Sequence, residues 1–368
     1  MLENLENEIK QYLETQFDSK TKIIHIGPLL EQDEKEDELK EFGYGKNILI
    51  KVRMNDKVRS YIMATLKENM FGHQHYYDRA KSLLFAYSSY NELPKHVKAL
   101  DLGFYSKKDN IKSIGDVKEF FLLREKVAGT EYAEDLEKIM DLDRLQELDL
   151  KRSKALAHYL AKIHSNKKFD DKKHLYERKI RELVGSAECI MGLTDSYPID
   201  LSYAPQESLE RIEKKCIQWR YKLKSKKERL SQVHGDIHPW NILFDEGTDF
   251  NLLDRSRGKW GEPADDVVAL SINYLFFSLL KEERINGAFF ELFKIFWEEY
   301  LKESEDNEIL EIAPPFFVYR SLVLASPIWY PDLDLNIRKK LFIFIENILS
   351  VDKFELKNTP EYFKIKNE

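Results

Sequence analysis

The chain has 368 residues, of which 43% are hydrophobic and 12% aromatic, so it can bury the core of two domains or of one domain with two lobes. A formal net charge of −7 argues against a general nucleic-acid binder, which needs a strongly positive surface. Its two cysteines, Cys189 and Cys216, provide neither a disulfide framework nor a cysteine-rich metal site.

Targeting segments are not expected in this chain. The N-terminus is acidic and lacks the charged-then-apolar layout of a signal peptide. The longest apolar run, 269–280, contains polar residues and is too short to span a bilayer. We therefore expect a cytoplasmic protein that contacts no membrane.

Residues 1–127 are expected to form a strand-rich lobe with one principal helix. Strand-like runs occur at 21–26, 47–52, 59–66, 97–103 and 119–126. The principal helix is predicted at 79–90, before Pro94, and a short amphipathic helix at 2–17. The densely acidic residues 31–41 predict a solvated loop.

Beyond Gly129 the pattern becomes mainly helical. Helices are predicted at 149–165, 175–184, 207–230, 265–280, 288–301, 315–325 and 336–350. Short strands are predicted at 230–233, 241–244 and 250–253. The segment 176–197 is interrupted by Gly185 and Gly192, a pattern that favours a shaped loop over a plain helix.

The stretch 234–241, His-Gly-Asp-Ile-His-Pro-Trp-Asn, carries the most information about chemistry. Asp236 and Asn241 flank a tight loop, and a short apolar strand follows that ends in Asp254. A phosphoryl donor arrives with hard metal ions, which need oxygen ligands, and the attacking hydroxyl needs an acceptor for its proton. The spacing therefore indicates phosphoryl transfer, with Asp236 serving the hydroxyl and the other two side chains serving the metals.

These residues resemble the signature of the aminoglycoside phosphotransferase/choline kinase family, whose members have a protein-kinase-like fold. Further segments match the same family: 125–129, 156–164 and 261–266. Others are typical of an uncharacterised branch of it: 71–73, 78–80 and 314–331. The resemblance implies a bilobal α+β fold. A small antiparallel-sheet lobe, 1–127, would bind the nucleotide, and a large, mostly helical lobe, 128–368, would carry the catalytic loop and the acceptor site.

The resemblance also implies roles for the motif residues. Asp236 is similar to the catalytic base, and Asn241 and Asp254 are similar to the ligands of Mg²⁺, with ATP as the phosphoryl donor. His234 and His238 are expected to brace the loop by hydrogen bonds, with direct participation in the chemistry as the alternative. The expected acceptor is a hydroxyl group on a small metabolite or an aminoglycoside-like molecule.

Residues that follow Asp254 add to this expectation. Arg255, Arg257 and Lys259 place three cations next to a metal carboxylate, where they could contact an anionic acceptor or donor phosphates. The alternative is that they only neutralise neighbouring carboxylates. The resemblance further implies that Asp266 holds the catalytic loop from the next helix.

The match is weaker in the first lobe, where the nucleotide should bind. Candidate contacts are Gly43, Gly45, Lys67, Arg79, Glu125 and Val127. The two glycines would let backbone amides approach phosphates, with an ordinary hairpin turn as the alternative. Lys67 or Arg79 would hold the α- and β-phosphates, although Lys67 lies at the end of its predicted strand. The main chain near Glu125 and Val127 is expected to bond adenine.

Acceptor recognition is expected from the second lobe, from 176–197 and from Arg320, Trp329 and Tyr330, with packing or a surface salt bridge as the alternative for each residue. Two other functions stay open. A protein kinase is disfavoured because Asp254 and Asp266 are only twelve positions apart, which leaves little room for a peptide platform. A catalytically inactive nucleotide-binding protein is favoured by the weak lysine motif and opposed by the complete Asp-Asn-Asp set. Neither nucleic-acid partners nor an oligomeric state are predicted.

Overall fold

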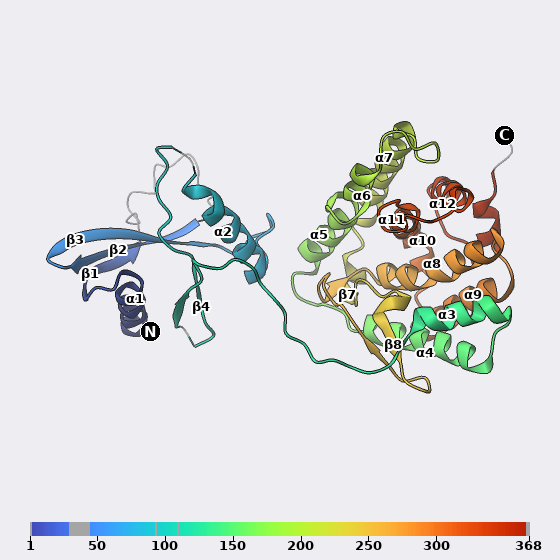
Figure 1. Cartoon of the computed structure of the whole chain (residues 1–368), viewed down its shortest axis with the longest axis horizontal. Helices are drawn as coiled ribbons and strands as arrows, with labels where there is room; N and C mark the ends of the chain where they lie inside the picture. Colours follow the sequence, from blue (N-terminus) through green and yellow to red (C-terminus); the bar gives the residue numbers. More distant parts are fainter. Residues whose placement is uncertain (1, 29–44, 93, 109, 366–368) are drawn as a thin grey trace. The chain divides into compact units, whose positions relative to one another are not determined.

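The computed structural model describes residues 2–28, 45–92, 94–108 and 110–365 (Figure 1). The chain divides into two compact units, Met1–Arg124 and Glu125–Glu368. The sequence placed the boundary between residues 127 and 128. Gly43 and the acidic loop predicted at 31–41 lie outside the described residues.

Within its described residues, unit 1 contains small antiparallel sheets and two helices. The helices are α1 (Leu2–Phe17) and α2 (Tyr76–Tyr90). One sheet has the strand order β1-β2-β3, formed by Thr21–Pro28, Gly45–Met54 and Lys57–Leu66. Two short strands, β4 (Gly103–Tyr105) and β5 (Ile111–Ser113), pair separately. The helix predicted at 2–17 and the first three strands are therefore confirmed.

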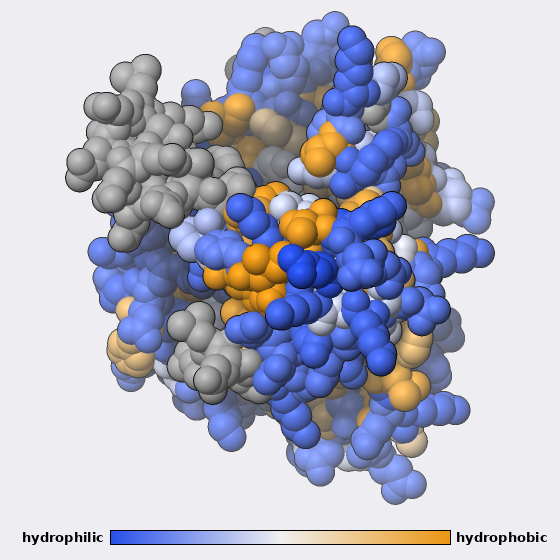
Figure 2. Space-filling model, turned by 90° about the vertical axis from the view of Figure 1, so that its left-hand side faces the viewer, coloured by the Kyte–Doolittle hydropathy of each residue, from blue (hydrophilic) through white to orange (hydrophobic). Residues whose placement is uncertain are grey.

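The core of unit 1 is small and lies between α1 and the three-stranded sheet. Its buried hydrophobic side chains are Ile9, Leu13, Ile50, Val52 and Met54. Helix α2 has no buried residue among those described. Figure 2 shows one face of the chain, on which hydrophobic side chains gather within a hydrophilic surface. Since burial of apolar surface is the main stabilising contribution to folding, unit 1 gains little of it from its own residues.

Two predicted strands of unit 1 are wrong. Residues 97–102 form no strand, because the side chain of Asn91 bonds both the N–H and the C=O of Ala99, at 3.1 and 2.9 Å. These are the backbone groups that a neighbouring strand would use. Residues 119–126 also form no strand, and Phe121, Leu122 and Leu123 are 87–90% exposed there. No strand among the described residues pairs with this apolar run.

Unit 2 is mostly helical. Its helices are α3 (Tyr132–Leu142), α4 (Glu147–His164), α5 (Lys172–Gly185), α6 (Ile190–Ser196), α7 (Gln206–Leu223), α8 (Pro263–Glu282), α9 (Gly287–Ser304), α10 (Ile309–Ile312), α11 (Pro314–Ala325) and α12 (Leu335–Ile348). Its short strands are β6 (Thr130–Glu131), β7 (Ser231–Gln232), β8 (Ile242–Phe244), β9 (Phe250–Leu252) and β10 (Trp260–Gly261). They form a β6-β8-β9 sheet and a β10-β7 pair, all antiparallel. The expected α+β class is confirmed.

Helix α8 lies at the centre of this unit and packs against α9 and α11 (Figure 1). It is apolar and long enough to cross a membrane, in contrast to the shorter run considered in the sequence, but 89% of that stretch is buried inside the unit. Such burial is typical of a core helix. Large aromatic side chains such as Trp297 and Phe317 complete the core around it.

The predicted helices of unit 2 are found, with two differences. The segment 176–197 is not a shaped loop: α5 continues to Gly185, and α6 follows after a break of four residues. The helix predicted at 207–230 ends at Leu223, and a separate 3₁₀ turn follows at Lys227–Arg229. Short breaks of this kind have no strong signature in apolar spacing.

Candidate active site

The predicted catalytic loop connects β7 to β8 in unit 2. β7 pairs with β10, and β8 pairs with both β6 and β9, so short antiparallel ladders hold the two ends of the loop. A 3₁₀ turn, Pro239–Asn241, closes it, with proline at the first position, where a missing N–H costs nothing. Gly235 has φ +91°, a conformation that favours glycine.

Asp266 anchors this loop from the first turn of α8. One carboxylate oxygen accepts from the His234 N–H and the other from the Gly235 N–H, each at 2.7 Å. His164, on α4, contacts the same carboxylate through Nε2 at 3.2 Å. Burial alone raises the pKa of Asp266, but these hydrogen bonds outweigh it and hold the pKa below its ordinary value. The expected anchoring role of Asp266 is confirmed.

Asp236 is half-buried in the loop and faces two arginines. Arg320, on α11, donates to its Oδ1 at 2.5 Å. The Nε of Arg257 lies 3.6 Å from its Oδ2. Burial raises the pKa of Asp236, but the charges of the two guanidinium groups outweigh it and keep the pKa below its usual value. The carboxylate is therefore ionised at neutral pH and accepts hydrogen bonds.

Arg320 is nearly buried and joins several parts of the site. Its Nη2 donates to the carbonyl of Gly235 at 3.1 Å and to Asp265 at 2.8 Å, in addition to the bond from Nη1 to Asp236. The sequence suggested Arg320 only for acceptor recognition and missed this contact. The sequence did contain a signal for this contact, because Arg320 is the one charged residue in the apolar helix α11 and a buried arginine needs a partner.

The two motif histidines occupy the inside of the loop. The Nδ1 of His234 accepts from the Asp236 N–H at 3.3 Å, and the Nε2 of His238 lies 3.1 Å from the Nδ2 of Asn241. Burial lowers the pKa of His238. The Nε2 of His234 and the Nδ1 of His238 are buried and make no hydrogen bond within the described residues. The contacts that are present brace the loop.

Asn241 and Asp254 lie at the same end of the β8–β9 hairpin. The Leu253 N–H donates to the carbonyl of Asn241 at 2.9 Å, so Asp254 follows immediately beside it. The charge of Asp254 acts on His238, which also contacts Asn241. The Nδ2 of Asn241 donates to the carbonyl of Asp236 at 3.0 Å, which leaves its Oδ1 to face a cation. Asp254 has φ +51°, an uncommon conformation that often occurs at functional sites.

The chemistry of these two side chains fits a magnesium ion. An amide oxygen and a carboxylate are the oxygen ligands that a hard divalent cation prefers. The structure thus brings Asp236, Asn241 and Asp254 onto one loop and one hairpin end.

The three cations after Asp254 have different surroundings. Arg255 donates through Nε and Nη2 to the carbonyl of Val233, at 3.1 and 2.8 Å, so its side chain supports the loop. Arg257 lies beside Asp236, whereas Lys259 is exposed. Neither expected role therefore applies to all three residues.

The candidate nucleotide contacts form no comparable cluster within the described residues. Gly45 begins β2, and Lys67 is exposed just after β3. Arg79 donates to the carbonyl of His73 at 2.8 Å, and so braces the segment before α2. Glu125 and Val127 lie in a segment without helix or strand. Their predicted contacts with nucleotide remain predictions.

A pocket of about 730 Å³ opens elsewhere on unit 2. It is lined by residues of α3, α4 and the β8–β9 turn: Gly129, Thr130, Asp135, Lys138, Ile139, Leu142, Gln146, Leu148, Asp149, Arg152, Phe244, Asp245 and Glu246. Arg152 forms an ion pair with Asp135 there and donates to the carbonyl of Asp245 at 2.6 Å. The three predicted catalytic and metal residues do not line this pocket.

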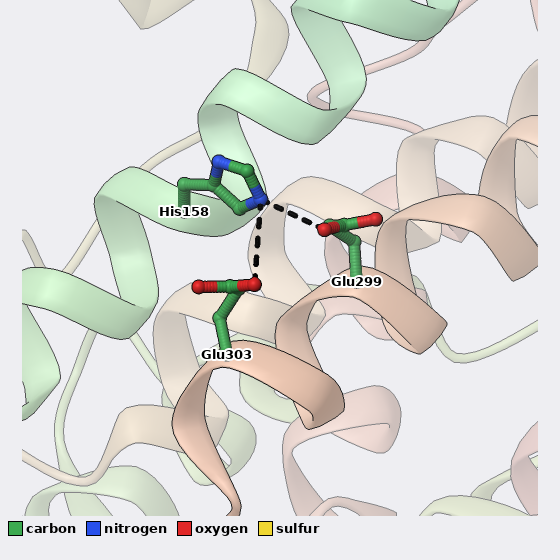
Figure 3. Close-up of side chains that lie close together, drawn as sticks. All are labelled: His158, Glu299 and Glu303. Atoms are coloured by element: carbon green, nitrogen blue, oxygen red, sulfur yellow. Dashed lines mark hydrogen bonds and ion pairs between the residues drawn. The ribbon is translucent and has the colours of Figure 1, made fainter.

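A group of metal-ligand residue types also lies on the surface of α4 and α9 (Figure 3). The Nε2 of His158 is 2.9 Å from Glu299 and 3.9 Å from Glu303. Hydrogen bonds from His158 and Lys302 lower the pKa of Glu299 to about 2. Lys302 and Lys154 already neutralise these carboxylates, at 3.0 and 3.6 Å from Glu299, so the group is a surface ion-pair network.

Comparisons with known proteins show the family of the chain. A family model described as a phosphotransferase enzyme family matches residues 109–293, which is half of the chain. No curated protein sequence matches. The chain is similar to the solved structure of a Plasmodium vivax ethanolamine kinase, with 14% identity, a TM-score of 0.35, and coverage of 95% of this chain and 82% of the other.

Two further solved structures are similar over nearly their whole length. One is a spectinomycin phosphotransferase in complex with ADP and spectinomycin, with 11% identity, 97% of each chain covered and a TM-score of 0.34. The other is an amicoumacin kinase in complex with AMP-PNP and Ca²⁺, with 13% identity, coverage of 97% of this chain and 99% of the other, and a TM-score of 0.38.

Proposed function

Because the chain belongs to the phosphotransferase enzyme family and has its protein-kinase-like fold, we propose that it transfers the γ-phosphoryl group of ATP to a hydroxyl group on a small molecule. Family membership makes the chain a phosphotransferase. The donor, the metal and the roles of individual residues belong to the proposal. Residues 1–127 are proposed to bind the nucleotide, through some of the candidates Gly43, Gly45, Lys67, Arg79, Glu125 and Val127.

The asymmetric surroundings of Asp236 carry this proposal. Arg320 holds Oδ1 at 2.5 Å, whereas no hydrogen bond reaches Oδ2 from the part of the chain that the structure describes. An acceptor hydroxyl can therefore donate to Oδ2, which fixes the direction of its lone pairs. Because the pKa of Asp236 is lowered, the carboxylate mainly orients the hydroxyl and takes its proton late in the transfer.

Asn241 and Asp254 are proposed to hold Mg²⁺ at the end of the β8–β9 hairpin. When bound, Mg²⁺ neutralises charge on the phosphate oxygens. His234 and His238 are proposed to keep the loop in shape, since their contacts are with loop atoms. Catalysis by positioning and electrostatics needs no covalent intermediate on the protein.

The first test is the substitution Asp236→Asn. The amide keeps the size of the side chain and can still accept from Arg320, but it cannot orient and deprotonate a hydroxyl. We expect kcat to fall by about 10²–10⁴-fold. The melting temperature, followed by tryptophan fluorescence, should change little. The rate of ADP release with a metabolite pool is the measurement.

The matched control is Asp249→Asn, since Asp249 is an exposed carboxylate in the nearby β8–β9 turn. Its rate should stay within twofold of wild type. A rate for Asp236→Asn within a few-fold of wild type would show that the assigned role is wrong. Parallel incubation with mixed proteins separates a small-molecule kinase from a protein kinase, and Mg²⁺-dependent ATP hydrolysis separates both from an inactive nucleotide-binding protein.

A further inference from the structure

Arg257 has hydrogen-bond donors that the protein leaves unused beside the proposed base. Its Nε is buried and makes no hydrogen bond within the described residues, although it lies 3.6 Å from the Oδ2 of Asp236. Its Nη2 is 3.8 Å from Glu188, and Nη1 reaches only the Sγ of Cys189, at 3.6 Å. A thiol is a weak acceptor, whereas a guanidinium group carries five N–H donors.

The neighbouring arginines have more hydrogen-bond partners, although the Nε of Arg320 also makes no hydrogen bond within the described residues. Arg255 is bonded to the carbonyl of Val233 through two nitrogens, and Arg320 is bonded to Asp236, Asp265 and the carbonyl of Gly235. A partly buried cation whose donors lack partners costs free energy of folding. The cost is recovered if an oxyanion binds there.

The side chain of Arg257 is also held in place. Its guanidinium group lies 5.5 Å from the ring centre of Tyr319, and that of Arg320 lies 4.5 Å from the same ring. A Cβ on Gly235 would lie 2.9 Å from the Cβ of Arg257, so the glycine allows the stem of Arg257 to pack against the loop. A held cation requires less ordering when an anion binds.

The position of Arg257 indicates that the anionic group belongs to the acceptor molecule. Oδ1 of Asp236 already accepts from Arg320, so Oδ2, the oxygen beside Arg257, is the freer acceptor for the hydroxyl of the substrate. The other neighbours of Arg257, Glu188 and Cys189, belong to the connection between α5 and α6. A group bound between them lies next to the hydroxyl. Guanidinium groups match carboxylate and phosphate groups by paired hydrogen bonds.

We propose that Arg257 forms a subsite for a carboxylate or phosphate group on the acceptor, so that the substrate class is hydroxyl compounds that carry an anionic group. This inference rests on the proposed kinase function. A cationic amino alcohol would place a like charge beside Arg257 and is the disfavoured class. Arg257 thus determines specificity for the acceptor, whereas Arg255 supports the catalytic loop.

The test uses the full-length protein with Mg²⁺ and ATP, and acceptors in matched pairs. Glycerate against glycerol, and gluconate against sorbitol, test a carboxylate. Glycerol 3-phosphate against glycerol, and glucose 6-phosphate against glucose, test a phosphate. Choline and ethanolamine form the cationic arm. We expect kcat/KM to be at least tenfold higher for the anionic acceptor than for its neutral partner, in either the carboxylate pairs or the phosphate pairs. The set of pairs that shows this difference identifies the anion.

Variants then assign the effect to the residue. Arg257→Met should raise KM for the preferred anionic acceptor at least tenfold, change KM for its neutral partner less than threefold, and leave KM for ATP within twofold. Arg257→Lys should recover part of the loss because it keeps the charge. Lys259→Met is the matched control, since Lys259 is an exposed cation of the same segment, and its kinetics should stay within twofold of wild type.

Several results would overturn the inference. One is a preference of the wild-type protein for the neutral or cationic acceptors, and another is the absence of turnover with every anionic acceptor. A third is an equal fall of kcat for all acceptors in Arg257→Met, which would place Arg257 next to the transferred phosphoryl group. If Arg257→Met does not fold, the wild-type preference and Arg257→Lys still decide. If the wild-type protein shows no ATP hydrolysis that Asp236→Asn reduces, the proposed function itself is contradicted.

Discussion

Asp266 is the side chain whose substitution should destabilise the catalytic loop most. Its one buried carboxylate accepts from the two N–H groups that precede Asp236. In Asp266→Asn the amide cannot accept from both, and His164 loses the carboxylate that its Nε2 contacts. We expect the free energy of unfolding at pH 7 to fall by about 3 kcal/mol, the size found when a buried pair is broken. The measurement is urea unfolding followed by tryptophan fluorescence, which reports unit 2 because all five tryptophans lie there.

The same substitution has a defined pH dependence. The folded pKa of Asp266 is lowered, so its ionised form stabilises the fold above the unfolded pKa of about 3.9, and this stabilisation is lost as the pH falls through the folded pKa. The difference between wild type and Asp266→Asn should therefore shrink below about pH 4. Asp195→Asn, at an exposed position of α6, should differ little from wild type. A constant difference from pH 7 to pH 3 would contradict the assigned ionisation.

The sequence predicted the contacts of the candidate site that are made between residues close together along the chain. The spacing of Asp236 and Asn241 indicates a loop closed by a short strand, and the structure has that loop. The contact between Arg320 and Asp236 spans 84 positions, and no local spacing encodes it. Arg320 could be suspected only because a charge in an apolar helix needs a partner.

Among the elements, the junction of β6 with β8 depends on Gly129. This residue has φ +136°, and a Cβ there would lie 2.9 Å from the Cβ of Leu243 and 3.0 Å from the carbonyl of Phe244. Gly129→Ala should therefore lower the free energy of unfolding of unit 2 by about 1–3 kcal/mol. Urea unfolding followed by tryptophan fluorescence measures it.

Gly247→Ala is the matched control in the β8–β9 turn, since nothing lies within 4 Å of an added Cβ and no positive φ is involved. Its free energy of unfolding should stay within about 0.5 kcal/mol of wild type. Equal effects of the two substitutions would show that the β6–β8 junction tolerates a side chain.

Helices were predicted better than strands for a physical reason. A helix makes its hydrogen bonds within its own segment, so apolar spacing and capping residues suffice to indicate α4, α8 or α12. A strand needs a partner from elsewhere in the chain. The apolar run at 119–126 resembles a strand locally, yet it pairs with nothing within the described residues, and this lack of pairing could not be foreseen from the run itself.

The exposed segment at the end of unit 1 predicts where a protease first cleaves the chain. Phe121, Leu122 and Leu123 are 87–90% exposed and lie outside any helix or strand. Chymotrypsin should therefore cleave first at 120–123, and the fragment that contains unit 2 should keep its cooperative unfolding transition. Mass spectrometry of the first products is the measurement.

The chain provides its own comparison site for this cleavage. Phe85 is 77% exposed but lies in α2, where its backbone is hydrogen-bonded, so cleavage there should come later. First cleavage within α2, or loss of the unfolding transition in the larger fragment, would contradict the division into two units.

The origin of Arg320 in α11 has a consequence for the boundaries of a working enzyme. The region that matches the family model ends at residue 293, whereas α11 begins at Pro314. A polypeptide trimmed to the matched region would retain His234 through Asp266 and still lack Arg320, the cation that holds one oxygen of the proposed base. Without this cation the side chain of Asp236 would be freer to turn and its pKa would rise, so under the proposed function the residues after 293 contribute to the active site.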